Sequence, residues 1–263
     1  KVTVRKRELA AQEALKISGV SSLTFSKSAT FKTEGGSGDG EVRWSITSGK
    51  KYATINAKTG KVLATGIGTV TVKAEKEGDG QYKDASTTFQ FKTVLPKKNE
   101  VVTISKVKYR VTNTASGKEA VAYAAPSSKN ITKVVIPAAV KMGSKSFKVT
   151  SIGKSAFKAC KKLKSVTIGK NVTVIGVSAF QYCKALTKIT IPANVQVIDR
   201  NVFAHDSNLK TITVKSKKIT QVGTKAFKGI NRKAKIKVPS SKLAQYKELF
   251  SQKGQAKTVK ITK

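Results

Sequence analysis

The sequence predicts a mainly β protein of two domains, an N-terminal β-sandwich and a C-terminal repeat solenoid. Three observations lead to this prediction. Thr, Val, Ser and Lys are prominent while Trp and Met occur once each, a composition that favours strands and turns over packed helices. The second half of the chain repeats itself every 23 residues. The charge is uneven, because residues 1–94 have a net charge of +7 and residues 95–263 one of +31.

The length of the chain and one proline- and lysine-containing stretch predict two domains and the boundary between them. A chain of 263 residues is long enough for about two domains with cores of ordinary size. We place the boundary at about residue 95, where the strand-like run of "TVLPKKNEVV" (93–102) meets a proline and two lysines. No stretch approaches the ~18–20 apolar residues of a membrane helix, so no membrane span is predicted. The chain opens on Lys without an apolar leader, and we expect a signal and an anchor to lie outside it.

The first domain consists of short β-type runs separated by turn signals. Val42, Trp44 and Ile46 fall on one face of a strand at period two. The tetrapeptide "KTGK" (58–61) lies between two such runs, as a hairpin turn does. Several short strands at this spacing indicate a β-sandwich.

The order "GGSGDGEVRWSITSG…ATINAKTGKVLATGIGTVTVKAEKEGDGQY" resembles the bacterial Ig-like domains (group 2-like) of surface proteins over about residues 15–94. The resemblance implies a spacer that holds another module away from the cell wall. It also implies that residues 1–14 are a linker or the exit strand of a preceding domain. The acidic "EGDGQYKD" (77–84) lacks the ligand spacing of a calcium loop, and we interpret it as a surface turn.

Apolar positions recur through the second half, each unit having a leucine, an alternating run and the phrase Ile-Gly-x-x-Ala-Phe. A single unit cannot close a core, but stacked units can, with each strand pairing with the next at ~4.8 Å to form a parallel sheet. This predicts a solenoid in which Phe fills the core and Ala permits a short helical turn on the opposite wall. The recurring residues are Ile152, Ile175 and Ile198, then Phe157, Phe180 and Phe203, then Leu163, Leu186 and Leu209, with Val222 and Phe227 in a fourth unit.

The phrases "LKSVTIG", "LTKITIP" and "LKTITVK" closely resemble the leucine-rich repeats of the BspA type, over about residues 131–238 in at least four units. A further unit upstream has its strand at 134–136 and an inserted hairpin with its turn at Gly143 to Lys145. Residues 100–130 are expected to form an N-terminal cap. Residues 239–263 are expected to form a C-terminal cap, a helix with a serine N-cap followed by the strand "KTVKIT".

Both cysteines, Cys160 and Cys183, lie three residues after the recurring Phe and one repeat apart. Stacking places them about one strand spacing apart, ~5 Å, which is within disulfide reach. Two thiolates without His or further Cys leave zinc two ligands short. We therefore predict buried free thiols, with a disulfide as the open alternative. The same position holds Asp206 and Ile230 in the next units, and Asp206 suggests a stack that is wetter or locally opened there.

The sequence predicts neither an enzyme nor a cofactor or metal site. The single histidine, His205, lies beside Asp206, but adjacent residues on a turn usually point apart, and no serine elbow or catalytic cysteine signature accompanies them. The five acidic residues of 95–263 are too scattered to nominate a carboxylate pair. The zinc-protease, P-loop and dinucleotide motifs are absent. We interpret His205 as an exposed loop residue.

The wet side of the repeat strands is the predicted ligand-binding face, because alternate residues of a strand point to opposite faces. Broad cationic surfaces attract polyanions, and solenoids often bind through their exposed sheet. A plainer interpretation is that Thr favours strands and Lys keeps a sheet soluble. The exposed face has few aromatic residues, and its charge comes mostly from Lys and not from Arg. These two features argue that nucleic acid would be attracted diffusely and that its bases would not be read. The predicted site residues are Lys133, Ser165, Thr167, Lys188, Thr190, Thr211, Thr213, Lys235 and Lys237.

The BspA-type resemblance implies a secreted or surface-attached protein that adheres to host or matrix proteins, and a Lys-rich version with Ig-like spacers is similar to those of gut bacteria. It implies no ligand residues. We predict a non-enzymatic adhesin that is extracellular or on the cell surface. It presents a cationic solenoid to a host or matrix protein or to an anionic polysaccharide. Of the possible oligomeric states, the monomer is favoured. The alternative is a structural cell-wall protein held electrostatically to anionic wall polymers. A cytoplasmic nucleic-acid binder is the least favoured class.

Overall fold

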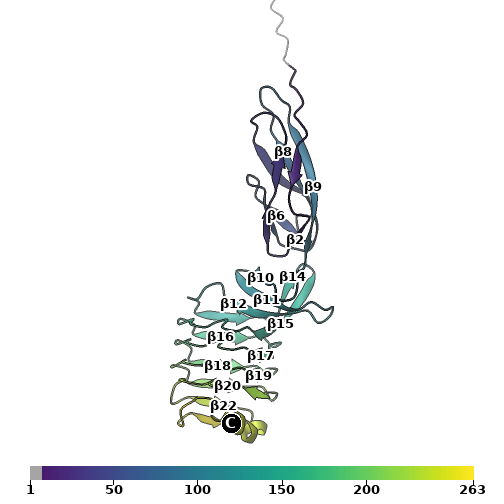
Figure 1. Cartoon of the computed structure of the whole chain (residues 1–263). Helices are drawn as coiled ribbons and strands as arrows, with labels where there is room; N and C mark the ends of the chain where they lie inside the picture. The colour runs from purple at the N-terminus through teal and green to yellow at the C-terminus, as the bar shows by residue number, and fades with distance from the viewer. Residues whose placement is uncertain (1–7) are drawn as a thin grey trace, which may run out of the picture. The chain divides into compact units, whose positions relative to one another are not determined.

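A computed structural model describes residues 8–263 and divides the chain into two compact units (Figure 1). The first unit ends at Pro96 and includes Met142–Lys145, and the second consists of Lys97–Lys141 and Ser146–Lys263. Regular structure in the described residues is almost entirely β. Residues 1–7, half of the predicted N-terminal linker, lie outside the described residues.

The first unit contains a four-stranded sheet in the order β2-β9-β8-β5, a three-stranded sheet in the order β3-β7-β6, and the antiparallel pair β1-β4. Within the four-stranded sheet β2 and β9 are parallel, while the other neighbours are antiparallel. The strands are β1 Lys16–Ser18, β2 Ser22–Thr24, β3 Ser28–Thr30, β4 Lys32–Glu34, β5 Val42–Ser48, β6 Ala53–Ile55, β7 Lys61–Ala64, β8 Gly68–Lys76 and β9 Ala85–Val94.

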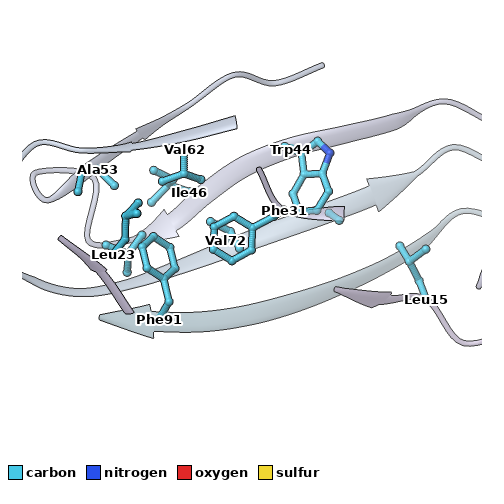
Figure 2. Close-up of a cluster of buried hydrophobic side chains, with 12 residues drawn as sticks. Leu15, Leu23, Phe31, Trp44, Ile46, Ala53, Val62, Val72 and Phe91 are labelled. Carbon is cyan, nitrogen blue, oxygen red and sulfur yellow. The ribbon is translucent and has the colours of Figure 1, made fainter. Parts of the chain in front are cut away.

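Side chains from both sheets form one hydrophobic cluster (Figure 2). Trp44 and Ile46 are buried at the period-two positions of β5, as the sequence predicts. The rings of Phe31 and Phe91 lie 5.1 Å apart in this cluster. The predicted hairpin joins β6 to β7, and its Gly60 has φ 65° with a Cβ position only 2.6 Å from the Phe31 carbonyl oxygen, which excludes a larger residue.

The second unit begins with an antiparallel meander of β10 (Val101–Ile104), β11 (Val107–Asn113) and β12 (Ala120–Ala125). β12 then pairs in parallel with β15 (Lys145–Ile152), so this cap leads directly into the repeats. The predicted inserted hairpin is present, since β14 (Ala139–Met142) pairs with β15.

The repeats form a β-solenoid whose coils contribute to two sheets (Figure 1). One sheet continues from β15 through the two-residue strands β17 (Val174–Ile175), β19 (Val197–Ile198) and β21 (Gln221–Val222), all parallel. The other, which we call the front sheet, consists of β13 Lys133–Ile136, β16 Ser165–Ile168, β18 Lys188–Ile191, β20 Thr211–Val214, β22 Lys235–Lys237 and β23 Lys260–Thr262.

The front sheet differs from the prediction because it is not one continuous ladder. β13 pairs with β16, and β18 pairs with β20, β22 and β23 in turn, but β16 and β18 belong to separate ladders. At this break the inward residue of β16, Val166, is only partly buried, whereas the equivalent Ile189 of β18 is buried. The inward residue is therefore less covered at the point where the ladder is interrupted.

The Ala-Phe phrases form turns, and the predicted short helical turns are wrong. We call this side of the solenoid the turn wall; it comprises residues 153–160, 176–183, 199–206 and 223–230, none of which is helical. The reason is that alternate backbone N–H groups bond to the next coil, and those between them bond only three residues back, whereas an α-helix requires a continuous series of bonds four residues back within one segment. The Phe157 N–H donates to the Ala179 carbonyl (2.7 Å), and the Phe180 N–H to the Val202 carbonyl (3.0 Å).

The recurring phenylalanines stack along the interior as a ladder of rings. Phe157 and Phe180 have ring centroids 5.1 Å apart and planes within 2°, and Phe180 and Phe203 follow at 5.7 Å and 7°. Tyr123 of the N-terminal cap stacks on Phe157 at 5.0 Å. Each ring therefore depends on the coils on both sides of it, as the repeat pattern predicts.

The C-terminal cap contains the 3-10 turn η1 (Ser240–Lys242) and the helix α1 (Leu243–Leu249). The predicted serine N-cap is wrong, because the residue at the helix N-cap is Lys242 and no side chain hydrogen-bonds there. The helix is instead held by its buried Tyr246, whose hydroxyl oxygen accepts a hydrogen bond from the Ile219 N–H at 2.9 Å.

Tyr246→Phe is expected to lower the free energy of unfolding by about 1–3 kcal/mol, because it leaves the buried Ile219 N–H without its acceptor. Chemical denaturation followed by circular dichroism measures the change. Tyr182→Phe is the matched control, since it removes a hydroxyl from an exposed side chain. Equal midpoints for the two variants would contradict a stabilising role for the buried bond.

Candidate binding face of the solenoid

The front sheet presents two columns of outward residues, because its strands are parallel and in register within each ladder. A position in one coil therefore lies beside the same position in the next. The first column is Lys133 and Ser165, then Lys188, Thr211, Lys235 and Lys260; the second is Val135 and Thr167, then Thr190, Thr213, Lys237 and Thr262.

The burial pattern alternates as the sequence predicts. In β18, Lys188 and Thr190 are exposed while Ile189 and Ile191 are buried. The nine predicted site residues thus share one face of the solenoid, in two groups on either side of the break between β16 and β18.

Lys260 and Thr262 of β23 belong to the same two columns but are missing from the predicted set. The signal was present, because "KTVKIT" has the alternation of the repeat strands and was predicted to be a strand. What the sequence did not indicate is that β23 adds one more parallel strand to this sheet after the intervening helix.

The face is strongly cationic and its charges are not neutralised by neighbouring acids. Lys188, Lys235 and Lys237 are exposed, and within residues 8–263 none has a recorded ion pair. Lys235 lies directly beside Lys260 across the β22-β23 ladder. Like charges opposite each other in a sheet repel, so a bound polyanion would gain by relieving this repulsion.

Cys160 and Cys183 are both buried and unpaired, in agreement with the predicted free thiols. The Cys183 thiol donates to the Phe157 carbonyl oxygen at 3.1 Å. Burial raises the pKa of both thiols above the ordinary value, so neither is a thiolate at neutral pH. The two residues contribute packing to the interior.

The expectation of a locally opened stack at Asp206 is wrong, because this residue is fully buried. One carboxyl oxygen, Oδ1, accepts a hydrogen bond from the Cys183 N–H at 2.7 Å. The other, Oδ2, has no partner among the described residues. Burial raises the pKa of the carboxyl to about 8, so the group is protonated and neutral at physiological pH.

His205 points away from the buried Asp206 and lies half-buried on the turn wall. Its ring stacks on that of Tyr182, an exposed contact that the sequence analysis missed. Their 23-residue separation was the available signal, since it matches the repeat. Within residues 8–263 there is no group of three or more His, Cys, Asp or Glu side chains able to hold a metal ion.

The sequence of the coils matches a known family. The model for the BspA type leucine rich repeat region matches residues 123–257 in six copies. The chain belongs to the BspA-type leucine-rich repeat family. No curated protein matches its sequence. In the described part of this BspA-type protein, no helix has the length and apolarity needed to cross a membrane.

Solved bacterial structures are similar to the BspA-type region. A leucine-rich repeat protein from Bacteroides ovatus is 27% identical with a TM-score of 0.42, over 52% of this chain and 37% of that one. A leucine-rich repeat protein from Bacteroides capillosus is 23% identical with a TM-score of 0.47, over 53% and 99%. The pneumococcal vaccine antigen PcpA is 19% identical with a TM-score of 0.42, over 54% and 47%. This chain thus spans little more than a third of the Bacteroides ovatus protein.

Proposed function

We propose that this protein is a non-enzymatic binding protein of the bacterial cell surface, an adhesin whose front sheet binds anionic ligands. The observation that carries the proposal is the pair of Lys and Thr columns. Five exposed lysines and a run of threonine hydroxyls lie at regular strand spacing on one face, in a solenoid half of net charge +31. Such a face offers repeated ionic and hydrogen-bonding contacts to an extended ligand.

An extended polyanion fits this face because its charges can follow the coils. Neighbouring strands are ~4.8 Å apart, so each column places donors at a regular interval along the solenoid. Anionic polysaccharides and acidic surfaces of host or matrix proteins both have this chemistry. The lysine side chains lack the fixed fork of arginine, so the ligand would be selected by the spacing of its charged groups along the columns and not by the shape of one planar acid group.

The first unit is proposed to be an Ig-like spacer. Its two sheets share one hydrophobic cluster, and the "KTGK" turn joins β6 to β7 as a hairpin. Residues 1–94 have a net charge of only +7, against +31 for residues 95–263. A spacer of this kind would hold the solenoid outward from an extracellular or surface attachment.

Binding to an array of glycans and matrix proteins, measured at low and high salt, tests the proposal. We expect one ligand class to remain bound at high salt, because contacts with defined groups are screened less than diffuse attraction. Binding to every polyanion that disappears at high salt would contradict the adhesin and support the alternative of electrostatic attachment to cell-wall polymers.

Reversing the charge of Lys188, Lys235 and Lys237 together is expected to weaken binding to the retained ligand by at least about tenfold, because each exposed ion pair contributes about 0.5 kcal/mol. The melting temperature should stay within about 2 °C of the unmodified protein, since these side chains are exposed and repel one another.

The matched control reverses Lys118, Lys141 and Lys247, which are exposed but lie outside the two columns. This control makes the same change in net charge as the first triple variant. If the position of the charges matters, the control should reduce binding far less. Equal losses for both triple variants would show that only the total charge matters and would overturn the front sheet as the binding face.

A further inference from the structure

An aromatic pair is exposed on the turn wall, away from the two columns of the front sheet. The rings of Tyr182 and His205 stack with centroids 4.8 Å apart and planes within 8°. Tyr182 is 36% exposed, the only tyrosine among the exposed large side chains of residues 8–263. We call these two residues the aromatic ledge.

The outer faces of the ledge are left open by the neighbouring coils. Equivalent positions of the turn wall are occupied by Ala159 in the preceding coil and Gly229 in the following coil, both too small to cover a ring. A Cβ atom on Gly229 would lie 3.2 Å from the His205 Nδ1 atom. The absence of a side chain at residue 229 therefore leaves space beside the half-buried imidazole.

The backbone at this column of positions is left-handed in every coil. Ala159 has φ 60°, Tyr182 φ 64°, His205 φ 67° and Gly229 φ 68°. Bulky residues rarely adopt this conformation. The preceding and following coils have small residues at the same position, so the fold does not require a large ring there. Two large rings thus occupy positions that favour small residues.

The ledge is surrounded by positive charge. Lys184 follows Tyr182 by two residues, and Lys228 lies in the next coil, where its carbonyl oxygen accepts the His205 N–H at 2.6 Å. Lys158 occupies the position equivalent to Lys228 three coils earlier, in the coil that precedes Tyr182. All three lysines are exposed, and none has a recorded ion pair within residues 8–263.

We propose that the aromatic ledge is a carbohydrate subsite, on which one sugar ring of an acidic polysaccharide stacks while the flanking lysines pair with its carboxylate or sulfate. Aromatic faces are electron-rich, so they attract the C–H groups of a sugar ring. A single ledge is suited to one sugar of a chain, whereas single-stranded nucleic acid is bound by successive stacking platforms, one for each base. This subsite rests on the proposed binding of anionic polymers and adds a second contact surface to it.

The test uses the full chain and two polyanionic probes. Polygalacturonate, a polymer of uronic acid, is the probe for the sugar subsite. Oligothymidylate is the comparison probe, a polyanion that contains no uronic acid rings. Replacing both ledge residues by alanine should weaken polygalacturonate binding about tenfold and leave oligothymidylate binding within about twofold. Folding should be unaffected, because Ala159 shows that alanine is accepted at this position. Tyr182→Phe should retain binding, since the ring and not the hydroxyl makes the contact.

Gly229→Ala is an independent variant, because its added methyl group would lie 3.2 Å from the His205 Nδ1 atom and crowd the imidazole without removing either ring. It should weaken polygalacturonate binding several-fold. If the unmodified protein binds polygalacturonate and the double alanine variant binds it equally, the ledge proposal is wrong while the front sheet proposal stands. An equal loss for both probes would identify a base-stacking platform instead and would also overturn the sugar subsite. No binding of polygalacturonate by the unmodified protein would overturn this subsite without affecting protein ligands of the front sheet.

Discussion

Phe180→Ala is expected to lower the free energy of unfolding of the solenoid by about 3–5 kcal/mol, the cost of removing a fully buried phenylalanine side chain. Phe180 is the middle ring of the ladder and stacks on Phe157 at 5.1 Å and on Phe203 at 5.7 Å. The cavity would open to two neighbouring coils at once, and neither has a flexible side chain at this position with which to fill it. The N–H bonds of the turn wall also hold these coils at fixed spacing, which limits collapse of the cavity.

Urea denaturation followed by far-ultraviolet circular dichroism measures this loss, and the fluorescence of Trp44 gives a separate signal from the first unit. Phe180→Leu is the matched control, because it keeps most of the apolar volume and should cost much less than the alanine variant. A loss below about 1 kcal/mol for Phe180→Ala would show that the stack adapts around the cavity, contrary to the fixed coil spacing.

The strands and their register could be predicted from the sequence because two periods coincide in them. Alternation of period two assigned Ile189 inward and Thr190 outward, and the repeat of 23 residues placed Thr190 beside Thr213. The face that carries the predicted binding residues follows from these two facts alone. The two sheets of the first unit were likewise indicated by alternating runs, such as that of Trp44 and Ile46.

The turn wall could not be predicted in the same way, since its conformation depends on neighbouring coils. Local sequence favoured a helical turn at the Ala-Phe phrase, but the Phe203 N–H bonds to the Ala226 carbonyl of the next coil at 2.9 Å. Residues such as Asn201 and Lys225 adopt positive φ to make this possible. The aromatic ledge was missed for the same reason, because stacking between Tyr182 and His205 requires the coils to be superposed at this wall.

The break in the front sheet also could not be predicted from the repeat pattern. The spacing from Thr167 to Thr190 is the same 23 residues as from Thr190 to Thr213, yet only the second pair is joined by a ladder. A periodic sequence predicts equal coils, and it contains no signal that separates the step from β16 to β18 from the step from β18 to β20.

The pH dependence of stability is the second large effect, and it originates from Asp206. In the unfolded chain this carboxyl ionises near its ordinary pKa of 3.8, whereas burial in the folded protein raises the pKa to about 8. Between these values the folded state holds a proton that the unfolded state has lost. The free energy of unfolding therefore falls as pH rises from about 4 to about 8, by a few kcal/mol, and levels off above that range.

Asp206→Asn isolates this effect, because the amide has nearly the shape of the protonated acid and its oxygen can still accept the Cys183 N–H. Near pH 4 the two proteins should have similar stability, and near pH 8 the variant should be more stable by a few kcal/mol. Urea denaturation at several pH values from 4 to 9 measures the difference, in which the contributions of the other carboxyl groups cancel. Asp206→Cys, which copies the residue of the two preceding coils, should show the same reduced slope up to about pH 8. Parallel pH profiles for the unmodified protein and both variants would mean that the Asp206 carboxyl is already ionised in the folded protein. A buried carboxylate requires a partner beside Oδ2, so this outcome would contradict a closed coil in which Oδ2 has none.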